Sequence, residues 1–148
     1  SKIEGLYCTL PPNTRNAILR PALRHISRLG MLQTLHIDCV VTVDIFQHLQ
    51  PMLSLEQLTI IFHRRFVKIT LPTWMKRMKK LNKLVVNANI SNWSFIPNSL
   101  YFISELRVPE RTQQLLESIL SDGWCPSIGS VLPNDTMGSP LSNFSDTV

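Results

Sequence analysis

The sequence predicts an α/β fold in which short parallel strands stack side by side and are joined by irregular helical turns. The first observation is a recurring pattern, Leu-x-x-Leu-x-(Ile/Val), with three clear copies and two weaker ones. The second is its spacing, because successive copies begin 29, 23, 26 and 22 residues apart, close to the range of about 20 to 29 residues expected of stacked repeats. In chain order the copies are Ile3/Leu6/Cys8, Leu32/Leu35/Ile37, Leu55/Leu58/Ile60, Leu81/Leu84/Val86 and Ile103/Leu106/Val108.

The spacing within each copy assigns its residues to two faces. Side chains alternate along a strand, so the fourth and sixth motif residues point inward and the residues between them point outward. One strand cannot bury that apolar edge alone, whereas stacked copies bury it against one another. The predicted fold class is therefore a leucine-rich-repeat solenoid, with short parallel strands on the concave side and irregular helical turns on the convex side.

The segments between the copies predict the helical turns, because their apolar residues recur at offsets of three and four. The ninth motif position of such repeats often carries an inward asparagine, which satisfies backbone groups of the following turn. Only Asn89 stands at that position here, so a continuous row of asparagines is absent and we expect an irregular array. The apolar residues are Ala22, Leu23, Ile26 and Leu29, then Phe46, Leu49 and Met52, then Trp74, Met75 and Met78. Proline cannot donate to a sheet ladder, and these connections hold Pro11, Pro12, Pro21, Pro51, Pro72 and Pro97.

Three regions are predicted from these patterns. Residues 1–108 are expected to form an irregular array of about five repeats. Residues 109–123 are expected to form a capping helix, because Glu110 to Ser121 is amphipathic and Gly123 follows it. Residues 124–148 are rich in serine, proline, glycine and asparagine, and we expect no regular structure there. Because the chain opens without methionine almost inside a repeat strand, we expect it to be a piece of a longer protein.

Composition favours an ordinary globular chain with a cytoplasmic or nucleocytoplasmic location. Of its 148 residues, 44% are hydrophobic and 17% charged, enough to bury a substantial core. No apolar run approaches the 18 or more residues of a membrane span, and the start has no signal-peptide stretch. Cys8, Cys39 and Cys125 show neither paired nor metal-ligand spacing, as is typical of a reducing compartment. Burial is the expected role of Cys8.

No catalytic constellation is visible, so we expect a protein that is not an enzyme and holds no metal. The histidines, His25, His36, His48 and His63, form no His-x-x-x-His pair, and the chain has no glycine-rich phosphate loop. His36 and His63 can meet on one side of the ladder, where contact surface is a commoner role than metal ligation.

A formal net charge of +5 arises largely from two clusters, His63-Arg64-Arg65 with Lys68, and Lys76-Arg77 with Lys79-Lys80. Such clusters can hold phosphate backbones or acidic protein surfaces. Solvation of the outer side of a repeat is the favoured interpretation. Nucleic-acid binding ranks last, because no aromatic residues alternate with the exposed basic positions as a stacking platform needs.

The segment from Leu71 to Met75, Leu-Pro-Thr-Trp-Met, and the strand motif of 78–86 carry a family resemblance. Together they resemble the Leu-Pro-x-Trp-(Met/Ile/Leu) unit and the following strand in the leucine-rich repeats of plant intracellular nucleotide-binding immune receptors, especially those of grasses. Segments 29–35 and 54–60 are similar to other repeats of that family, so the resemblance covers roughly residues 3 to 108.

The resemblance implies a ligand-sensing and autoinhibitory role in defence. Its partners would be a pathogen effector or a guarded host protein, and the nucleotide-binding domain of the parent protein. The fragment itself would hold no cofactor, since ADP or ATP belongs to that other domain, and no phosphate-binding loop or signalling motif occurs here. The alternative is the substrate-recognition array of an F-box-type ubiquitin-ligase adaptor, although no F-box sequence is present.

The residues expected to contact a protein partner are the outward-facing motif positions on neighbouring strands. Ile61 and Val85, side by side, would form the apolar centre of this contact within a polar rim. The full set is Gln33, Thr34, His36, Asp38, Glu56, Gln57, Thr59, Ile61, Asn82, Lys83, Val85, Asn87, Ser104, Glu105 and Arg107.

Overall fold

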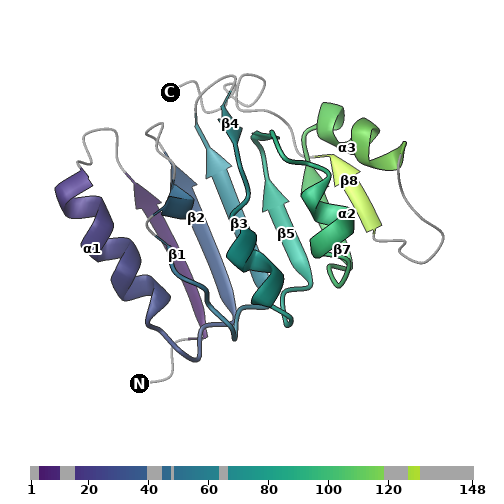
Figure 1. Cartoon of the computed structure of the whole chain (residues 1–148). Helices are drawn as coiled ribbons and strands as arrows, with labels where there is room; N and C mark the ends of the chain where they lie inside the picture. Colours follow the sequence, from purple (N-terminus) through teal and green to yellow (C-terminus); the bar gives the residue numbers. More distant parts are fainter. Residues whose placement is uncertain are drawn as a thin grey trace.

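The computed structural model of the chain describes residues 4–10, 16–39, 45–47, 49–63, 67–118 and 127–130. Within this part, six strands form one parallel sheet in the order β1-β2-β3-β5-β7-β8 (Figure 1). This confirms the predicted α/β class with a parallel sheet. The strands are β1 (Gly5–Leu10), β2 (Thr34–Cys39), β3 (Gln57–Phe62), β5 (Lys83–Val86), β7 (Glu105–Val108) and β8 (Ser127–Ser130). A second sheet pairs β4 (Lys68–Ile69) with β6 (Asn89–Ile90) in parallel.

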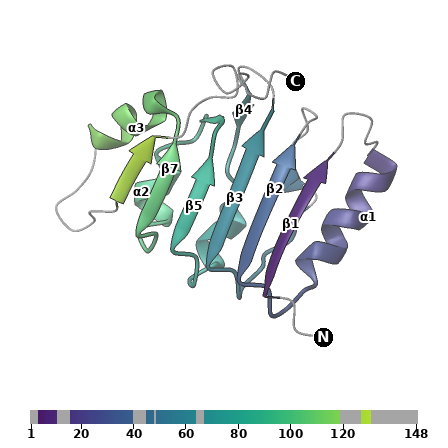
Figure 2. The same ribbon diagram turned by 180° about the vertical axis from the view of Figure 1, so that it is seen from behind.

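Helical segments cover one face of the large sheet and leave the other open. The helices are α1 (Asn16–Ser27), α2 (Phe95–Ser99) and α3 (Glu110–Glu117), with 3-10 turns η1 (Ile45–Gln47) and η2 (Thr73–Arg77). In Figure 1 the short helical turns lie in front of the strands, whereas Figure 2, from behind, shows the strands uncovered. We call these the helix-covered face and the open face. Two prolines of the connections, Pro21 and Pro97, lie inside helices α1 and α2.

Equivalent positions of the five motif copies pair with one another across the sheet. The fourth-position leucines stand in one register row, Leu6, Leu35, Leu58, Leu84 and Leu106. The backbone repeats as well, because two successive N–H groups donate to one carbonyl of the preceding copy at each of four steps. Gln33 and Thr34 donate to Glu4, Glu56 and Gln57 to Gln33, Asn82 and Lys83 to Glu56, and Ser104 and Glu105 to Asn82, all at 2.7–3.1 Å.

The core lies between the large sheet and the helical segments. Strands β2 and β3 alternate buried and outward residues, as the motif predicts. The first-position residues Leu32, Leu55, Leu81 and Ile103 are each at most 1% exposed. Burial of each such side chain contributes roughly 1.5–3 kcal/mol. Leu6 and Cys8 are only half-buried, because β1 is an edge strand with a neighbour on one side.

The expected inward position of Asn89 is wrong. Asn89 lies in β6 and is partly exposed, whereas Asn87 is 6% exposed and holds the backbone of Phe62. The Asn87 side-chain oxygen accepts the Phe62 N–H at 2.7 Å, and its amide donates to the Phe62 carbonyl at 2.9 Å. Asn92 makes the same pair of bonds with Leu71, both at 2.9 Å. Three consecutive buried residues, Val86 to Ala88, break the alternation of the strand and shift the inward asparagine by two positions.

The C-terminal region differs in part from its prediction. Helix α3 forms but is described only to Glu117, and residues 119–123 of the expected capping helix lie outside the described residues. Strand β8 lies in the segment expected to lack regular structure and adds to the sheet beside β7. The remaining residues of 124–148 lie outside the described part. Among the helices that are described, none has the length and apolar character needed to cross a membrane.

Candidate protein-binding surface

The open face gathers the outward motif residues into rows that cross the strands. One row contains Thr34, Gln57, Lys83 and Glu105, and the next contains Tyr7, His36, Thr59, Val85 and Arg107. Asp38 and Ile61 stand side by side in a third row. Since neighbouring strands lie about 4.8 Å apart, side chains from different motif copies form one continuous surface.

Fourteen of the fifteen predicted contact residues keep exposed surface. The exposed ones are Gln33, Thr34, Gln57, Asn82 and Ser104. The partly buried ones are His36, Asp38, Glu56, Thr59, Ile61, Lys83, Val85, Glu105 and Arg107. The exception is Asn87, for which the prediction of an outward side chain is wrong, because its amide is buried against the Phe62 backbone.

An aromatic and histidine cluster occupies the β1–β2 end of the open face. Both His36 Nε2, at 3.0 Å, and His63 Nε2, at 3.4 Å, lie near the same Asp38 carboxylate oxygen. The Tyr7 hydroxyl donates to the other oxygen of Asp38. The Tyr7 ring stacks on His36, with 4.4 Å between ring centroids and 22° between planes. We call these four residues the Asp38 cluster.

Two members of the Asp38 cluster, Tyr7 and His63, were absent from the predicted contact residues. Tyr7 holds the fifth position of the first, weaker motif copy, which is the position of His36 in the second copy. This shared motif position could have been used to predict Tyr7 as a contact residue from the sequence. His63 follows β3 directly, and the sequence analysis grouped it with the basic residues Arg64 and Arg65, which lie outside the described part. The expectation that His36 and His63 can meet is confirmed, because both lie near the same Asp38 oxygen.

Partial burial shapes the electrostatics of the Asp38 cluster. Burial raises the pKa of the Asp38 carboxyl above its ordinary value, against the hydrogen bond and charge of His63, which act to lower it. Burial, and then the charge of His63, lower the pKa of His36. Both shifts favour uncharged forms of these groups, so the charge of this end of the face depends on pH in the acidic range.

The β5–β7 end of the open face is an ion-pair cluster. A Glu105 carboxylate oxygen lies 3.6 Å from Lys83 Nζ and 3.2 Å from an Arg107 guanidinium nitrogen. The Arg107 side chain lies against the backbone of β8, because a Cβ added at Gly129 would stand 1.8 Å from its Nη1. Glycine at this position therefore makes room for the arginine.

Between the two clusters the open face is less polar. Thr59 and Val85 face each other in register, and Ile61 follows Thr59 on the same side of β3. Ile61 and Val85 are both partly exposed. The prediction that they stand side by side is wrong, because Val85 pairs with Thr59 and Ile61 pairs with Asp38. The face therefore has an aromatic–acidic end, a less polar middle and a charged end.

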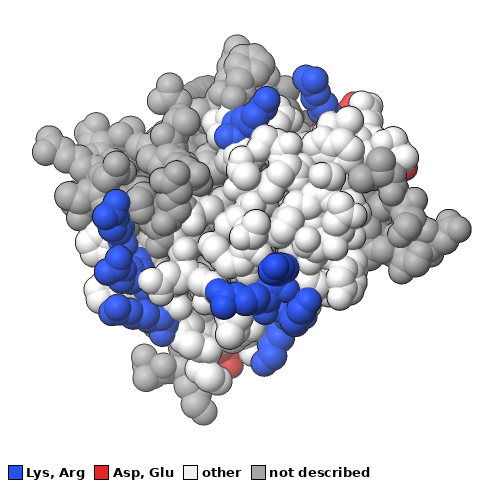
Figure 3. Space-filling view, viewed as in Figure 1, with Lys and Arg blue, Asp and Glu red and all other residues white. Residues whose placement is uncertain are grey.

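The second basic cluster lies on the helix-covered face. Lys76, Arg77, Lys79 and Lys80 are exposed in and after η2. Figure 3 shows two groups of Lys and Arg side chains on this face, at the left and at the lower centre, with further basic side chains near the upper edge. The other group comes from the exposed Arg20, Arg24 and Arg28 of α1 and the turn after it. Lys79 Nζ lies over the rings of Tyr101 and Phe102, 5.6 Å and 4.9 Å from their centroids.

The free thiols and the acidic and imidazole groups are the candidate metal ligands in the part of the chain that the structure describes. No set of three His, Cys, Asp or Glu residues there is arranged to hold a metal ion. Cys8 and Cys39 are free thiols, and burial raises the pKa of Cys39 to about 12. A thiol with so high a pKa is not a nucleophile near neutral pH. Cys125 lies outside the described residues.

Comparison of the chain with protein-family models, with curated protein sequences and with solved structures finds no match. Inference about function therefore rests on the open face and on the register of the motif copies.

Proposed function

We propose that this chain is a non-catalytic protein-recognition module, a leucine-rich-repeat array whose open face contacts a protein partner. The single observation that carries this proposal is the register row of Leu6, Leu35, Leu58, Leu84 and Leu106. The repeated pair of backbone hydrogen bonds at each step supports it. Units that stack with one geometry present their outward residues as a surface, and such extended surfaces are suited to binding proteins.

The composition of the open face supports a protein ligand. Ile61 and Val85 supply an apolar centre, and the Asp38 cluster and the Glu105 ion pairs flank it with polar groups. Protein interfaces combine an apolar core with a polar rim in this way. Side chains already held by neighbours lose less conformational freedom on binding, which favours affinity.

Within this class, we propose that the chain is the ligand-sensing and autoinhibitory repeat region of a plant intracellular nucleotide-binding immune receptor of the grass type. The support is the resemblance around Leu71 to Met75. Thr73 to Met75 of this segment form the first part of η2, in which Met75 is fully buried and Trp74 packs edge-on to Phe46 at 6.5 Å between ring centroids. The partners would then be a pathogen effector or a guarded host protein and the parent's own nucleotide-binding domain, in the cytoplasm.

The parent transcript separates this receptor from the F-box alternative. We would sequence about 400 codons upstream of Ser1, two or more domains' worth of chain. A Gly-x-x-x-x-Gly-Lys-(Ser/Thr) loop there supports the receptor, whereas a short helical adaptor-binding motif supports the ubiquitin-ligase array instead.

The binding surface is tested by the double substitution Ile61→Glu with Val85→Glu. We expect it to abolish binding of a partner that the wild-type chain captures from plant extract and that is then purified for calorimetry. The matched control is Lys76→Glu with Lys80→Glu, which alters two exposed residues of the helix-covered face. Undiminished binding by the Ile61 and Val85 variant, with an unchanged circular dichroism spectrum, would refute the assignment of the open face.

A further inference from the structure

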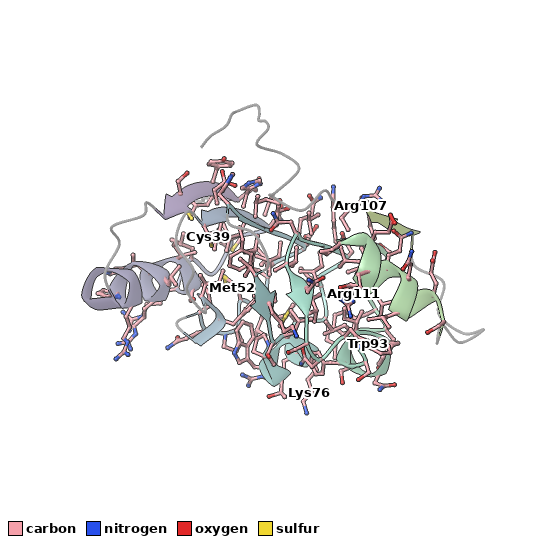
Figure 4. All side chains as sticks on the ribbon, turned by 90° about the horizontal axis from the view of Figure 1, so that it is seen from above. Cys39, Met52, Lys76, Trp93, Arg107 and Arg111 are labelled. Atoms are coloured by element: carbon pink, nitrogen blue, oxygen red, sulfur yellow. The ribbon has the colours of Figure 1, made fainter. Side chains whose placement is uncertain are left out.

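A small cavity lies away from the open face, between the β4–β6 sheet and α3. Its volume is about 220 Å³, and three parts of the chain line it. Lys68 comes from β4, Asn89 to Ser91 and Trp93 come from β6 and the turn after it, and Arg111, Thr112 and Leu115 come from α3. Figure 4 labels Trp93 and Arg111, which lie on the same side of the molecule in that view.

The cavity carries two cations that form no ion pair with an acidic side chain among the described residues. Lys68 and Arg111 are both exposed at it. Within the described residues, the ion pairs closer than 4.0 Å involve Asp38 and Glu105 on the open face, and none involves Lys68 or Arg111. A guanidinium and an ammonium group that share one cavity attract a carboxylate or a phosphate, and the guanidinium can bind either through two parallel hydrogen bonds.

A nearly buried threonine lines the same cavity. Thr112 is only 2% exposed as a residue, and it belongs to the cavity lining. This position leaves the Thr112 hydroxyl able to donate to a bound oxyanion. Asn89, partly exposed beside it, adds a second neutral donor.

Apart from the exposed Ser91, the rest of the lining is apolar, and the cavity is small. Trp93 contributes a partly buried indole, with Ile90 buried and Leu115 exposed at the edge. Sites for whole small molecules usually measure about 300–1,000 Å³, so a cavity of about 220 Å³ suits a single side chain. An occupant with an anionic head and a planar or apolar stem would satisfy both parts of the lining.

We propose that this cavity binds an oxyanion-bearing side chain of a polypeptide partner, a phosphorylated residue or an acidic one. The polypeptide source of the side chain rests on the proposed function as a protein-recognition module. The binding chemistry rests on the side chains that line the cavity, chiefly Lys68 and Arg111. Two cations match a phosphomonoester, which carries about −1.5 to −2 charge at pH 7, and the Trp93 ring matches an aromatic stem.

The test titrates the full chain with O-phospho-L-tyrosine, N-acetyl-L-glutamate, inorganic phosphate and L-tyrosine by calorimetry. We expect saturable binding of one of the first two with a Kd of about 1 mM or tighter, and no binding of L-tyrosine. Tighter binding of phosphotyrosine assigns a phosphorylated partner residue, and tighter binding of acetylglutamate assigns an acidic one. Inorganic phosphate bound as tightly as either would overturn the proposal, because the stem would then contribute nothing.

Variants distinguish binding in the cavity from non-specific attraction of anions to a basic protein. Arg111→Gln should weaken binding at least tenfold, and Thr112→Val, which keeps the shape but loses the hydroxyl, should weaken it severalfold. The control Lys80→Gln removes the same charge from an exposed site outside the cavity. Equal weakening by Arg111→Gln and Lys80→Gln would overturn the proposal. Because Arg111 is exposed, its variant should fold, which an unchanged amide NMR spectrum away from α3 verifies.

Failure of this inference and failure of the proposed function are distinguishable. If the open-face variant at Ile61 and Val85 still binds the partner while the cavity binds phosphotyrosine, the open-face assignment fails and the cavity stands. If the open-face variant loses the partner but none of the small anions binds, the cavity proposal fails and the recognition surface stands.

Discussion

The two faces of the same strands differ in what their side chains do. On the inner face, Leu58 and Ile60 of β3 are at most 1% exposed and contact the core. On the open face, Thr59 and Ile61 of the same strand stay partly exposed between two polar clusters. The inner residues therefore supply the packing that holds the sheet against the helices, while the open residues keep exposed surface, which is where the proposed function places the partner.

The largest predicted effect is a difference in unfolding free energy between substitutions of two adjacent residues, one on each face. We expect Leu58→Ala to cost about 2–5 kcal/mol of unfolding free energy, because it leaves a cavity in a close-packed core. Thr59→Ala, one residue away on the open face, should cost less than about 1 kcal/mol. Urea denaturation followed by circular dichroism measures both, and similar costs would show that the faces do not differ as described.

A smaller effect concerns the two asparagines. Asn87→Ala should cost roughly 1–3 kcal/mol, because it leaves the Phe62 N–H and carbonyl without their partners. Asn89→Ala should change stability by no more than about 0.5 kcal/mol, since that residue is partly exposed in β6. The same denaturation experiment applies. If Asn89→Ala lowered the unfolding free energy as much as Asn87→Ala does, Asn89 would point inward after all, as the motif predicted.

The Asp38 cluster should make stability depend weakly on pH. Because the pKa of His36 is lowered on folding, its contribution is present above the unfolded value of about 6.5 and is lost as pH falls through the lowered pKa. The raised pKa of Asp38 acts oppositely, with a contribution present below about 3.9 and lost as pH rises through the raised value.

We therefore expect stability to fall by less than about 1 kcal/mol between about pH 7 and pH 5, since His36 is partly solvated. His36→Gln should flatten this dependence. His25→Gln, at an exposed position of α1, should leave it unchanged. Denaturation midpoints across that pH range measure the effect. If stability changes with pH equally in the wild type and in His36→Gln, the His36 imidazole is not the cause of the pH dependence.

The smallest effect tests the opposite end of the open face. Gly129→Ala should displace the Arg107 guanidinium from β8 and cost about 0–1 kcal/mol through its ion pair with Glu105. Gly5→Ala is the matched control on the other edge strand, where the nearest atom, Thr34 Cβ, is at 4.0 Å. NMR shifts of the arginine side chain report the displacement, and unchanged shifts would contradict the contact.

Much of the fold could be predicted because strand periodicity is a local property. The positions of Leu32, Leu55 and Leu81 suffice to locate the inner face of each central strand, and the structure buries all three. The outward set came from the same alternation and failed only at Asn87, where three consecutive buried residues break it. Strand β8 has no motif copy, so its pairing with β7 had no local signal.

The sequence by itself determined the repeating inner positions, the parallel sheet and the outward rows, because each depends on residues a few positions apart. Only the tertiary structure decided which side chains meet across units. Tyr7 and Asp38 are 31 residues apart in the chain, and the lining of the α3 cavity joins Lys68 to Arg111. Such contacts between distant side chains depend on the register between strands and on unequal loop lengths, which no local pattern specifies.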